Sequence, residues 1–398
     1  MTHFKFSDND PIVIVAAKRT AIGSFLGTLS NTPADQLGAH VIKTVLDDVC
    51  IEPDSVDQVL MGQVLTAAAG QNPARQAAIQ AGIPESKTAI TINQVCGSGL
   101  RTVAMAAGSV ALGESNIVIA GGQENMSLSP HAAHLRSGHK FGDASLTDTM
   151  IKDGLWDKFN DYHMGQTAEN IAEKYNISRE KQDEFAAMSQ MKAGMAIEQG
   201  KFKNEITPIT VKQRREEITF DTDQFPRPKT TAEKLSNLKP AFKKDGTVTA
   251  GNASGLNDGA AATIIMRQSK AEKLGLEPLA RIVSWATKGV DPAVMGTGPI
   301  PASKAALEAA GWDVHDLDLA ESNEAFAAQS CAVLQELDLS SQITNIHGGA
   351  IALGHPIGAS GTRCLVTLIH ALRQEDANKG LVTLCIGGGM GIAMCIER

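Results

Sequence analysis

The stretch that decides the fold of this chain is Asn93-Gln94-Val95-Cys96-Gly97-Ser98-Gly99. Residues 89–92 in front of it form a short apolar run, which predicts a strand, and residues 100–112 behind it are rich in Ala and Val, which predicts a buried helix. Cys96 is therefore expected on a tight turn between a strand and a helix. The glycines beside it let the backbone bend sharply and come close to a ligand.

A helix that begins directly after Cys96 would change the chemistry of its thiol. The N-terminus of a helix presents free N–H groups and a positive partial charge. We therefore expect the pKa of Cys96 to fall below the ordinary value of about 8.5, which favours a thiolate nucleophile. The alternative is a buried structural cysteine, which is the commoner role of an isolated Cys.

The composition is that of an ordinary soluble protein with two or three domains. The chain has 398 residues, of which 43% are hydrophobic and 20% charged. Its net charge of −8 argues against general nucleic-acid binding. Its six Cys lack paired metal-ligand spacing, which favours free thiols in a reducing compartment and no metal site. The first residues lack the apolar core of a targeting signal, and no run has transmembrane length, so we expect a cytoplasmic protein without a membrane partner.

Strands and helices alternate along the chain, and the second half repeats the plan of the first. This alternation predicts an α/β fold with a mostly parallel sheet covered on both faces. Thr32-Pro33 is expected to cap and open a helix, as Ile300-Pro301 is in the second half. The strand at residues 116–120 is expected to end at Gly121-Gly122. The expected strands are residues 11–17, 56–61, 89–92 and 116–120 in the first half, and 280–286, 317–320, 381–386 and 391–396 in the second.

A large insertion separates the last two strands of the first repeat. The strand at residues 391–396 follows its neighbour at once, whereas its counterpart at residues 260–266 is long delayed. Within the insertion, residues 165–175 and 178–199 predict helices, and residues 214–244 predict a loop that could cover a ligand. The expected units are residues 1–122 plus 255–277, an inserted loop domain at 123–254, and residues 278–398.

Four further side chains are candidates for chemistry beside Cys96. Asn323 follows a predicted strand, His355 lies in a Gly-rich turn ahead of a helix, Cys385 ends a strand before three glycines, and His163 begins a helix in the insertion. Sites in open α/β sheets form beyond the carboxyl ends of strands, where the repeat places all but His163. His355 is the best-placed base for a Cys nucleophile. Taken singly, each has an ordinary structural role as a core cysteine, a turn asparagine or a helix-start histidine.

Jointly, these motifs resemble the thiolase family over essentially the whole chain, and within it the biosynthetic type that joins two acetyl-CoA molecules. The resemblance implies two repeated βαβαβαββ halves stacked as an αβαβα sandwich, with an inserted loop domain. The motifs that carry it, besides residues 93–99, are Gly251-Asn252-Ala253-Ser254-Gly255-Leu256-Asn257-Asp258-Gly259, Asn323-Glu324-Ala325-Phe326, the run from Gly348 to Gly361 around Gly354-His355-Pro356, and Cys385-Ile386-Gly387-Gly388-Gly389-Met390-Gly391.

The resemblance implies a role for each catalytic residue. Cys96 matches the nucleophile that carries the acetyl group, and His355 matches the base that activates it. Cys385 matches the acid/base that takes an α-proton from a second acetyl-CoA. Asn323 matches the residue that holds a water, which binds the thioester oxygen together with His355. The backbone N–H groups of Cys96 and Gly387 match a second oxyanion hole.

The resemblance also implies a substrate site, and no cofactor, since coenzyme A thioesters are the substrates. Arg227, with Lys229 and Lys234, is expected to face the nucleotide part of coenzyme A. Lys234 departs from relatives with a small polar residue there, and His347 departs from relatives with Asn. The residues that match the family's coenzyme A site are Leu155, His163, Met164, Arg227, Phe242, Ala250 and Ser254, with Phe326 near the acyl pocket.

The expected partners are acetyl-CoA, acetoacetyl-CoA, CoA and further copies of this chain. The family likeness implies a homotetramer built as a dimer of dimers. We expect the helix and strand around Asn116 to pair two chains by continuing their sheets. The loop at residues 130–143, which is apolar and His-rich, is expected to clasp two such pairs.

Three other functions stay open at this point. A degradative 3-ketoacyl-CoA thiolase would share the catalytic residues, although His163-Met164-Gly165 and the loop at residues 130–143 favour the short-chain type. An inactive scaffold that binds coenzyme A or lipid would not need two thiols and a base. A Cys–His hydrolase would explain neither Cys385 nor the repeat. The sequence leaves the pathway, the preferred direction and the range of chain lengths open.

Overall fold

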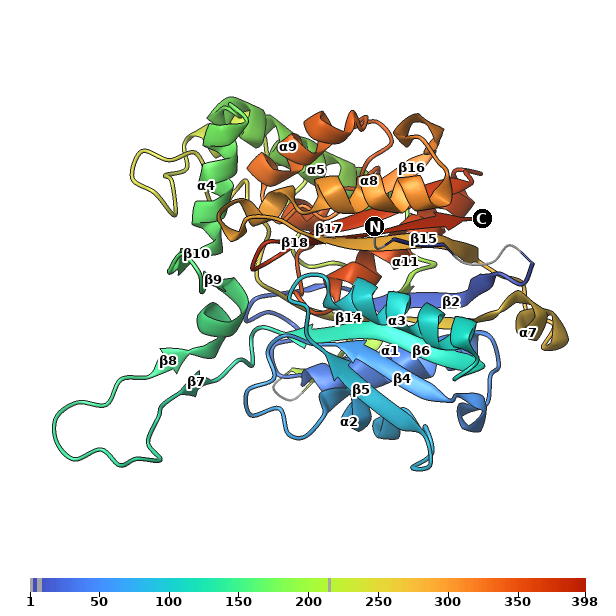
Figure 1. Cartoon of the computed structure of the whole chain (residues 1–398). Coiled ribbons are helices and arrows are strands. Elements are labelled where there is room, and N and C mark those ends of the chain that lie inside the picture. Colours follow the sequence, from blue (N-terminus) through green and yellow to red (C-terminus); the bar gives the residue numbers. More distant parts are fainter. Residues whose placement is uncertain (1–2, 6–8, 214–215) are drawn as a thin grey trace.

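Two sheets lie one above the other, with helices above, between and below them (Figure 1). The computed structural model of the protein describes residues 3–5, 9–213 and 216–398. The lower sheet has the strand order β5 (Thr88–Ile92), β4 (Gln58–Gly62), β6 (Ile117–Asn125), β14 (Asn257–Arg267) and β2 (Ile12–Thr20). The upper sheet has the order β15 (Ala280–Gly289), β18 (Met390–Glu397), β17 (Lys379–Ile386) and β16 (Leu319–Ser322).

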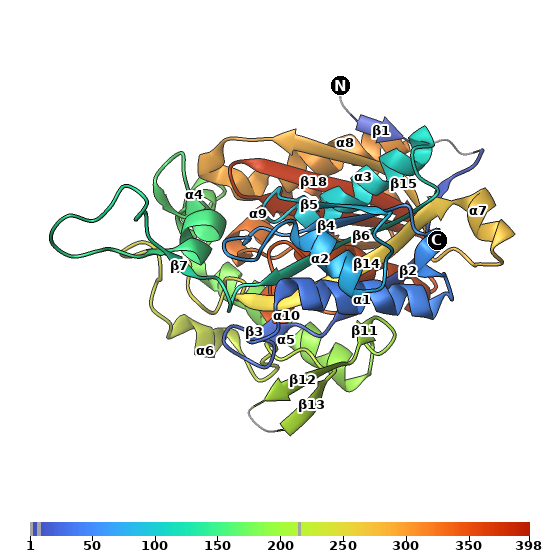
Figure 2. The same ribbon diagram turned by 90° about the horizontal axis from the view of Figure 1, so that it is seen from below.

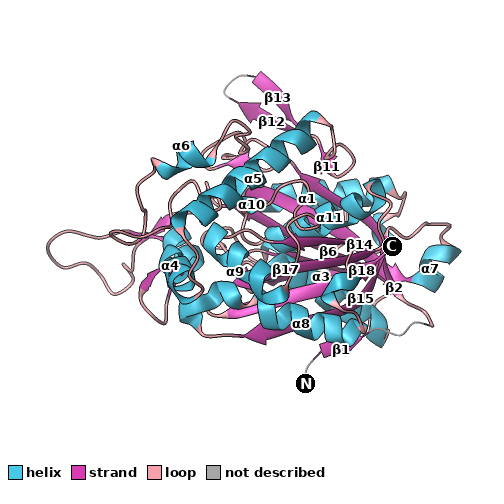
Figure 3. Cartoon of the chain, turned by 90° about the horizontal axis from the view of Figure 1, so that it is seen from above, coloured by secondary structure: helices cyan, strands magenta, loops and turns pink. Residues whose placement is uncertain are grey.

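Five helices complete the layers. The two helices between the sheets are α3 (Ser98–Leu112) and α11 (Ser360–Gln374), which contact each other and both sheets. The outer helices are α1 (Ala34–Asp48) and α2 (Pro73–Gln80) on the lower sheet and α8 (Pro299–Ala310) on the upper one (Figure 1). Figure 3 shows α8 beside β15 and β18 of the upper sheet. β2 and β15 share two residue pairs, which join the two sheets at one corner. This five-layer α/β arrangement is the expected one.

The strand directions correct the expectation of a mostly parallel sheet. β4 pairs in parallel with β5 and β6, and β16 pairs in parallel with β17. β14 and β18, however, each run antiparallel to both of their neighbours. The sheets are therefore mixed, because each half ends in a hairpin whose second strand lies between two strands of the opposite direction.

The predicted end of the strand at residues 116–120 is wrong. β6 does not end at Gly121-Gly122 but runs on to Asn125, and all nine of its residues are buried. A Cβ at Gly121 would lie 2.3 Å from the Ala261 carbonyl oxygen, and one at Gly122 would lie 2.1 Å from the Gly358 oxygen. The two glycines therefore permit close backbone contacts inside the strand instead of ending it.

The remaining elements agree with the sequence in their order, with small corrections. α1 begins at Ala34 with Pro33 at its N-cap and no side-chain cap, so the expected cap at Thr32 is wrong. In the second half, α9 (Ala327–Leu337) follows β16, and the counterpart of β5 is reduced to a single bridge between Ala320 and Thr344. Short elements elsewhere are β1 (His3–Lys5), β3 (Gly23–Ser24), η1 (Pro53–Ser55), α7 (Gln268–Lys273), η3 (Pro292–Thr297), η4 (Val314–Asp316) and α10 (Ala350–Leu353).

Between β6 and β14 the chain forms the elements of the insertion. α4 (Met164–Lys174) and α5 (Arg179–Glu198) lie where helices were expected, and Ser178 Oγ caps α5 by accepting from the Lys181 N–H. The expected loop at residues 214–244 is wrong in part, since it contains β13 (Glu216–Phe220) and α6 (Ala232–Ser236); residues 214–215 lie outside the described part. β13 pairs with β12 (Ile209–Gln213) as a hairpin at the margin of the molecule (Figure 2). β11 (Ile206–Thr207) adds to β2.

The apolar core has three main parts, one on each side of the sheets and one between them. The middle part packs α3 against α11, with Leu100, Val103, Leu365 and Leu368 all at most 1% exposed. The segment Val95–Leu112 is long and apolar enough to cross a membrane, but 61% of it is buried inside the protein. α3 is therefore the central core helix, and Cys96 lies directly before it.

The position of β6 also overturns one expected contact between chains. β6 is hydrogen-bonded to β4 on one side and β14 on the other, so the strand after Asn116 has no free edge with which to pair a second chain. The lower sheet ends instead at β5, where Ile90 is 41% exposed. The loop at residues 130–143 does project from the body, between the paired β7 (His131–Ala132) and β8 (Thr147–Asp148) (Figure 1).

Substitution of Gly122 should destabilise the fold, because a Cβ there meets backbone from the other half of the chain. We expect Gly122→Ala to lower the stability by about 1–3 kcal/mol or more, the usual cost of overpacking a core. Thermal unfolding measures this. Gly108→Ala is the matched control, since nothing lies within 4 Å of its added Cβ on α3 and Ala is the better helix former. Equal melting temperatures for the two variants would contradict the close contact.

Candidate active site

The Cys96 turn is held in a strained conformation by its own side chains. Val95 has φ +46°, a left-handed value that is costly for a β-branched residue. Asn93 Oδ1 accepts the Val95 N–H at 2.9 Å, and the Ser98 hydroxyl donates to the Val95 carbonyl at 2.6 Å. Ser98 Oγ also accepts the Gln94 N–H. Such strain persists only where neighbours fix the backbone, and here it sets the position of the Cys96 thiol.

Burial determines the charge state of Cys96 and overturns the expected thiolate. Partial burial and, to a smaller extent, the nearby Glu124 carboxylate raise the pKa of Cys96 to about 11. Hydrogen bonds from the backbone N–H groups of Gly387 and of Cys96 itself lower the pKa, but by less. The start of α3 therefore does not give a standing thiolate. The same two N–H groups lie against the sulfur, where the resemblance expects an oxyanion hole.

His355 lies in the turn between α10 and α11, and its backbone is fixed by Asn257. The Asn257 Oδ1 accepts the His355 N–H at 2.9 Å. The imidazole Nδ1 lies 2.5 Å from Ser360 Oγ, whereas the buried Nε2 has no hydrogen-bond partner among the described residues. Burial, aided by the charge of Arg363, lowers the pKa of His355 to about 3. The imidazole is therefore neutral, with Nε2 free of any competing bond.

Cys385 and Asn323 are buried just behind the surface of the site. Cys385 ends β17 and is 0% exposed; burial and the nearby Cys96 raise its pKa well above the ordinary value. Asn323 follows β16 and is 1% exposed. Its Nδ2 has no partner among the described residues, and Cys364 Sγ lies 3.9 Å from its Oδ1. An unpaired buried amide of this kind fits the expected role of holding a water.

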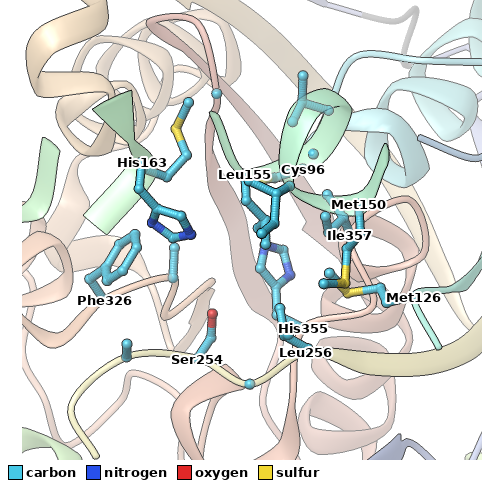
Figure 4. Close-up of a pocket in the computed structure, with 18 of the residues that line it drawn as sticks. Cys96, Met126, Met150, Leu155, His163, Ser254, Leu256, Phe326, His355 and Ile357 are labelled. Atoms are coloured by element: carbon cyan, nitrogen blue, oxygen red, sulfur yellow. The ribbon is translucent and has the colours of Figure 1, made fainter. Parts of the chain in front are cut away.

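Cys96 and His355 face one cavity of about 380 Å³ (Figure 4). The His355 ring points toward Cys96 and Leu155 in this view. Gly387 also lines the cavity, whereas Cys385 and Asn323 do not. Seven of the eight expected coenzyme A and acyl residues line it as well: Leu155, His163, Met164, Phe242, Ala250, Ser254 and Phe326.

Arg227 is the expected ligand residue that the cavity does not contain. Its side chain is exposed, and its backbone N–H donates to Gln190 Oε1. Lys229 and Lys234 are exposed beside it, and Lys234 Nζ donates to the Lys229 carbonyl. These three cations lie outside the cavity. The variant residue His347 is buried against Phe202.

Three aromatic rings form one wall of the cavity. His163 stacks on Phe242 at a centroid distance of 4.7 Å, and Phe242 meets Phe326 edge-on at 6.2 Å. His163 Nδ1 accepts the Gly165 N–H and so caps α4, and burial lowers the pKa of this imidazole. This wall joins the insertion to the second half of the chain, since His163 lies at the N-cap of α4 and Phe326 at the N-cap of α9.

Glu124 and Glu324 are two buried carboxylates that sequence reasoning gave no role. Glu124 accepts the N–H groups of Val64, Leu65 and Gly358, which ties the end of β6 to the turn after His355. Burial raises its pKa to about 7. Glu324 accepts from Ser189, Asn345 and the Ile351 N–H, and so fixes the segment before His355. The signal in the sequence that could have revealed these two carboxylates is a charged residue at the end of an otherwise apolar strand.

Nearly the whole chain matches a known family. A model of the thiolase N-terminal domain matches residues 12–269, and one of the thiolase C-terminal domain matches residues 276–398. The chain belongs to the thiolase family. An acetyl-CoA acetyltransferase of Paracoccus denitrificans is 60% identical, with 97% of this chain and 99% of that protein covered. One from Pseudomonas aeruginosa is 59% identical at the same coverage.

Solved thiolase structures have the same fold. The acetyl-CoA acetyltransferase of Bacillus anthracis superposes with a TM-score of 0.95 at 46% identity, covering 98% of both chains. Human mitochondrial 3-ketoacyl-CoA thiolase in complex with CoA superposes with a TM-score of 0.94 at 42% identity, covering 99% of both chains. The fold class and the family expected from the motifs are thus confirmed.

The raised pKa of Cys96 predicts how its alkylation depends on pH. In His355→Ala, which lacks the base, only the thiolate that water produces can react with iodoacetamide. Below a pKa of about 11 that fraction grows about tenfold per pH unit, so the rate should rise steadily from pH 7 to 10. Mass spectrometry of the Cys96 peptide measures it, with the exposed Cys50 as an internal control. An alkylation rate that stops rising below pH 9 would instead support a Cys96 thiolate stabilised by the start of α3.

Proposed function

We propose that the protein catalyses the reversible Claisen condensation of two acetyl-CoA molecules to acetoacetyl-CoA and CoA through an acetyl-Cys96 thioester. The observation that carries this proposal is the placement of a thiol, a neutral imidazole and two backbone N–H donors around one largely apolar cavity. The high identity to acetyl-CoA acetyltransferases over nearly the whole chain supports the choice of substrate.

In the first half-reaction Cys96 takes the acetyl group. Its proton passes to His355 Nε2 as the sulfur bonds to the carbonyl carbon of acetyl-CoA. The oxyanion that forms accepts hydrogen bonds from the N–H groups of Cys96 and Gly387. The bond to the CoA sulfur then breaks, and that sulfur takes the proton from His355. The products are acetyl-Cys96 and CoA.

In the second half-reaction a carbon–carbon bond replaces the thioester. Cys385 gives its proton to His355 Nε2, and the resulting thiolate removes an α-proton from the second acetyl-CoA. The enolate oxygen accepts hydrogen bonds from the Nε2–H of His355 and from a water on Asn323. The carbanion attacks the carbonyl of acetyl-Cys96, and the bond to the Cys96 sulfur breaks. That sulfur takes the proton from His355 Nε2, and Cys385 keeps the α-proton as its thiol hydrogen. Acetylation of Cys96 removes the neighbouring ionisable thiol that raises the pKa of Cys385, which favours this order of steps.

Coenzyme A enters the cavity past the wall formed by His163, Phe242 and Phe326. Arg227, with Lys229 and Lys234 beside it, is exposed outside the cavity, where it would meet the phosphates of the nucleotide. The residues described contain no group of three or more His, Cys, Asp and Glu suited to a metal ion. The proposed chemistry uses protein groups alone, and its free thiols suit the reducing cytoplasm.

Substitution of Cys96 and substitution of Cys385 should impair different half-reactions. Cys96→Ser should abolish turnover and take no label from radioactive acetyl-CoA, because a serine hydroxyl is a far poorer nucleophile. Cys385→Ser should still be labelled on Cys96 but fail to exchange the α-protons of acetyl-CoA in heavy water. Its condensation should fall by about a hundred- to ten-thousand-fold, the usual contribution of a positioned base.

Two outcomes would contradict this division of labour. Labelling that survives in Cys96→Ser would place the nucleophile elsewhere. Loss of acetylation in Cys385→Ser as complete as in Cys96→Ser would make Cys385 a support for the nucleophile. The buried Cys395, which lies on β18 away from the cavity, supplies the matched control as Cys395→Ser, which should keep both half-reactions.

We also propose that the chain assembles as a homotetramer through the loop at residues 130–143. This loop and its flanks carry exposed large apolar side chains on an arm outside the body: Leu135 is 55% exposed, Phe141 98% and Leu146 65%. Apolar groups so placed fit contacts with another chain. Deletion of residues 132–138 should leave dimers in sedimentation velocity, with the near-ultraviolet spectrum of the body unchanged. Tetramers in the deletion variant would refute the contact.

A degradative 3-ketoacyl-CoA thiolase is the second candidate, because the human mitochondrial enzyme with that name shares the fold over the whole chain. It differs from the first candidate in the length of acyl chain accepted. Phe242, Phe326 and Met295 pack in one apolar cluster with Cys385. Thiolysis rates from acetoacetyl-CoA to long-chain 3-ketoacyl-CoA distinguish the two, since only the second candidate keeps its rate with length.

A further inference from the structure

The hydrogen bonds of Ser360 determine which nitrogen of His355 carries the proton. Ser360 is the first residue of α11 and is 0% exposed. Its hydroxyl donates to the Pro356 carbonyl at 2.9 Å, one helical turn back. The same oxygen lies 2.5 Å from His355 Nδ1. A hydroxyl has one proton to donate and two lone pairs that accept.

Two arrangements of the protons satisfy Ser360. In one its proton lies on the Pro356 carbonyl and Nδ1 carries the hydrogen; in the other the hydroxyl donates to Nδ1 and Nε2 carries the hydrogen. The second leaves a buried Nε2–H without an acceptor in the described structure, so the first is favoured. A neutral imidazole has one N–H, and the other nitrogen is then a bare lone pair. That nitrogen is Nε2, which is buried and without a hydrogen-bond partner in the described part of the chain.

We infer that Ser360 is a positioning residue that holds His355 in its Nδ1–H tautomer, so that Nε2 is ready to take the proton of Cys96. This inference rests on the proposed function only for the identity of the acyl group that Cys96 then receives. The bond itself would serve any reaction in which Cys96 must first lose its proton to His355.

The bond also supports the next state of the ring. When Nε2 takes the proton from Cys96, both ring nitrogens carry hydrogen, and the buried Nδ1–H must keep an acceptor. Ser360 Oγ is that acceptor, and Asn257 fixes the backbone of His355 from the opposite side. A charge-assisted hydrogen bond of this kind is about twice as strong as a neutral one. Ser360 thereby makes proton uptake easier where burial and Arg363 oppose it.

The charged and titratable groups around Cys96 and His355 come from three elements. Arg363 on α11 opposes a positive imidazole, and Glu124 at the end of β6 opposes a negative Cys96. Cys385 on β17 interacts with Cys96. None of these groups hydrogen-bonds to the His355 ring in the described structure. Loss of the Ser360 oxygen therefore leaves Nδ1 with no replacement acceptor among them.

The test compares Ser360→Ala with Ser360→Thr, which keeps the hydroxyl. Ser303→Ala is the matched control, because Ser303 is also 0% exposed but lies on α8, outside the site, with its Oγ unpaired in the described structure. Ser360→Ala should lower kcat roughly ten- to a hundredfold with KM little changed, a part of the ~10²–10⁴ that a positioned base contributes. Ser360→Thr should recover most of this loss, and Ser303→Ala should lose none.

Two measurements on the unacylated protein separate positioning from packing. Nitrogen-15 spectra of histidine-labelled protein, with the His355 signals assigned by their loss in His355→Ala, should show the Nδ1–H tautomer in the wild type and a mixed or Nε2–H tautomer in Ser360→Ala. The rate of Cys96 alkylation should fall most near neutral pH in Ser360→Ala, so that its profile shifts to higher pH.

The outcomes distinguish this inference from the proposed function. An Nδ1–H tautomer that persists in Ser360→Ala, or an alkylation rate reduced by the same factor at every pH, would overturn the role of Ser360. Failure of the protein to condense acetyl-CoA would overturn the proposed function alone, since neither the tautomer nor the alkylation needs that substrate.

Discussion

The close packing of the two central helices is the contact on which the site depends. α3 carries Cys96 directly before its first turn, and α11 follows His355. A Cβ on Gly99 would lie 2.8 Å from the Thr362 nitrogen, and one on Gly361 would lie 2.3 Å from the Leu100 nitrogen. Only bare backbone on both sides permits this approach. It brings the two helix starts, one from each half of the repeat, to the same cavity, so that a thiol and a base far apart in sequence become neighbours.

Much of this arrangement could be predicted because it is local. The turn at residues 93–99, the helix behind it and the repeat of strand, turn and helix in the second half follow from spacing and glycine content. The edge at which Cys96 and His355 meet follows from the direction of the strands. The role of Gly121 and Gly122 could not be predicted, because a glycine that ends a strand and one that admits a neighbouring backbone look the same in sequence. Whether the strand after Asn116 can pair with a second chain depends on which strand lies at the edge of the sheet, and the sequence does not show this.

The charge state of Cys96 was predicted wrongly for a related reason. A helix start favours a thiolate by a modest amount, and its effect is visible in sequence. Burial acts the other way and depends on the whole fold, and here it is larger. The result is a pair of neutral groups, a thiol near pKa 11 and an imidazole near pKa 3, instead of an ion pair. A neutral thiol is less open to oxidation and alkylation than a thiolate.

The place of the insertion affects how the chain can fold during synthesis. β14 lies between β2 and β6 in the lower sheet and pairs with both. It ends at Arg267, after the whole insertion has been made. Until then the growing chain carries two unpaired, largely apolar strand edges, which are templates for wrong pairing. The lower sheet can therefore close only after residue 267 of 398 has been made.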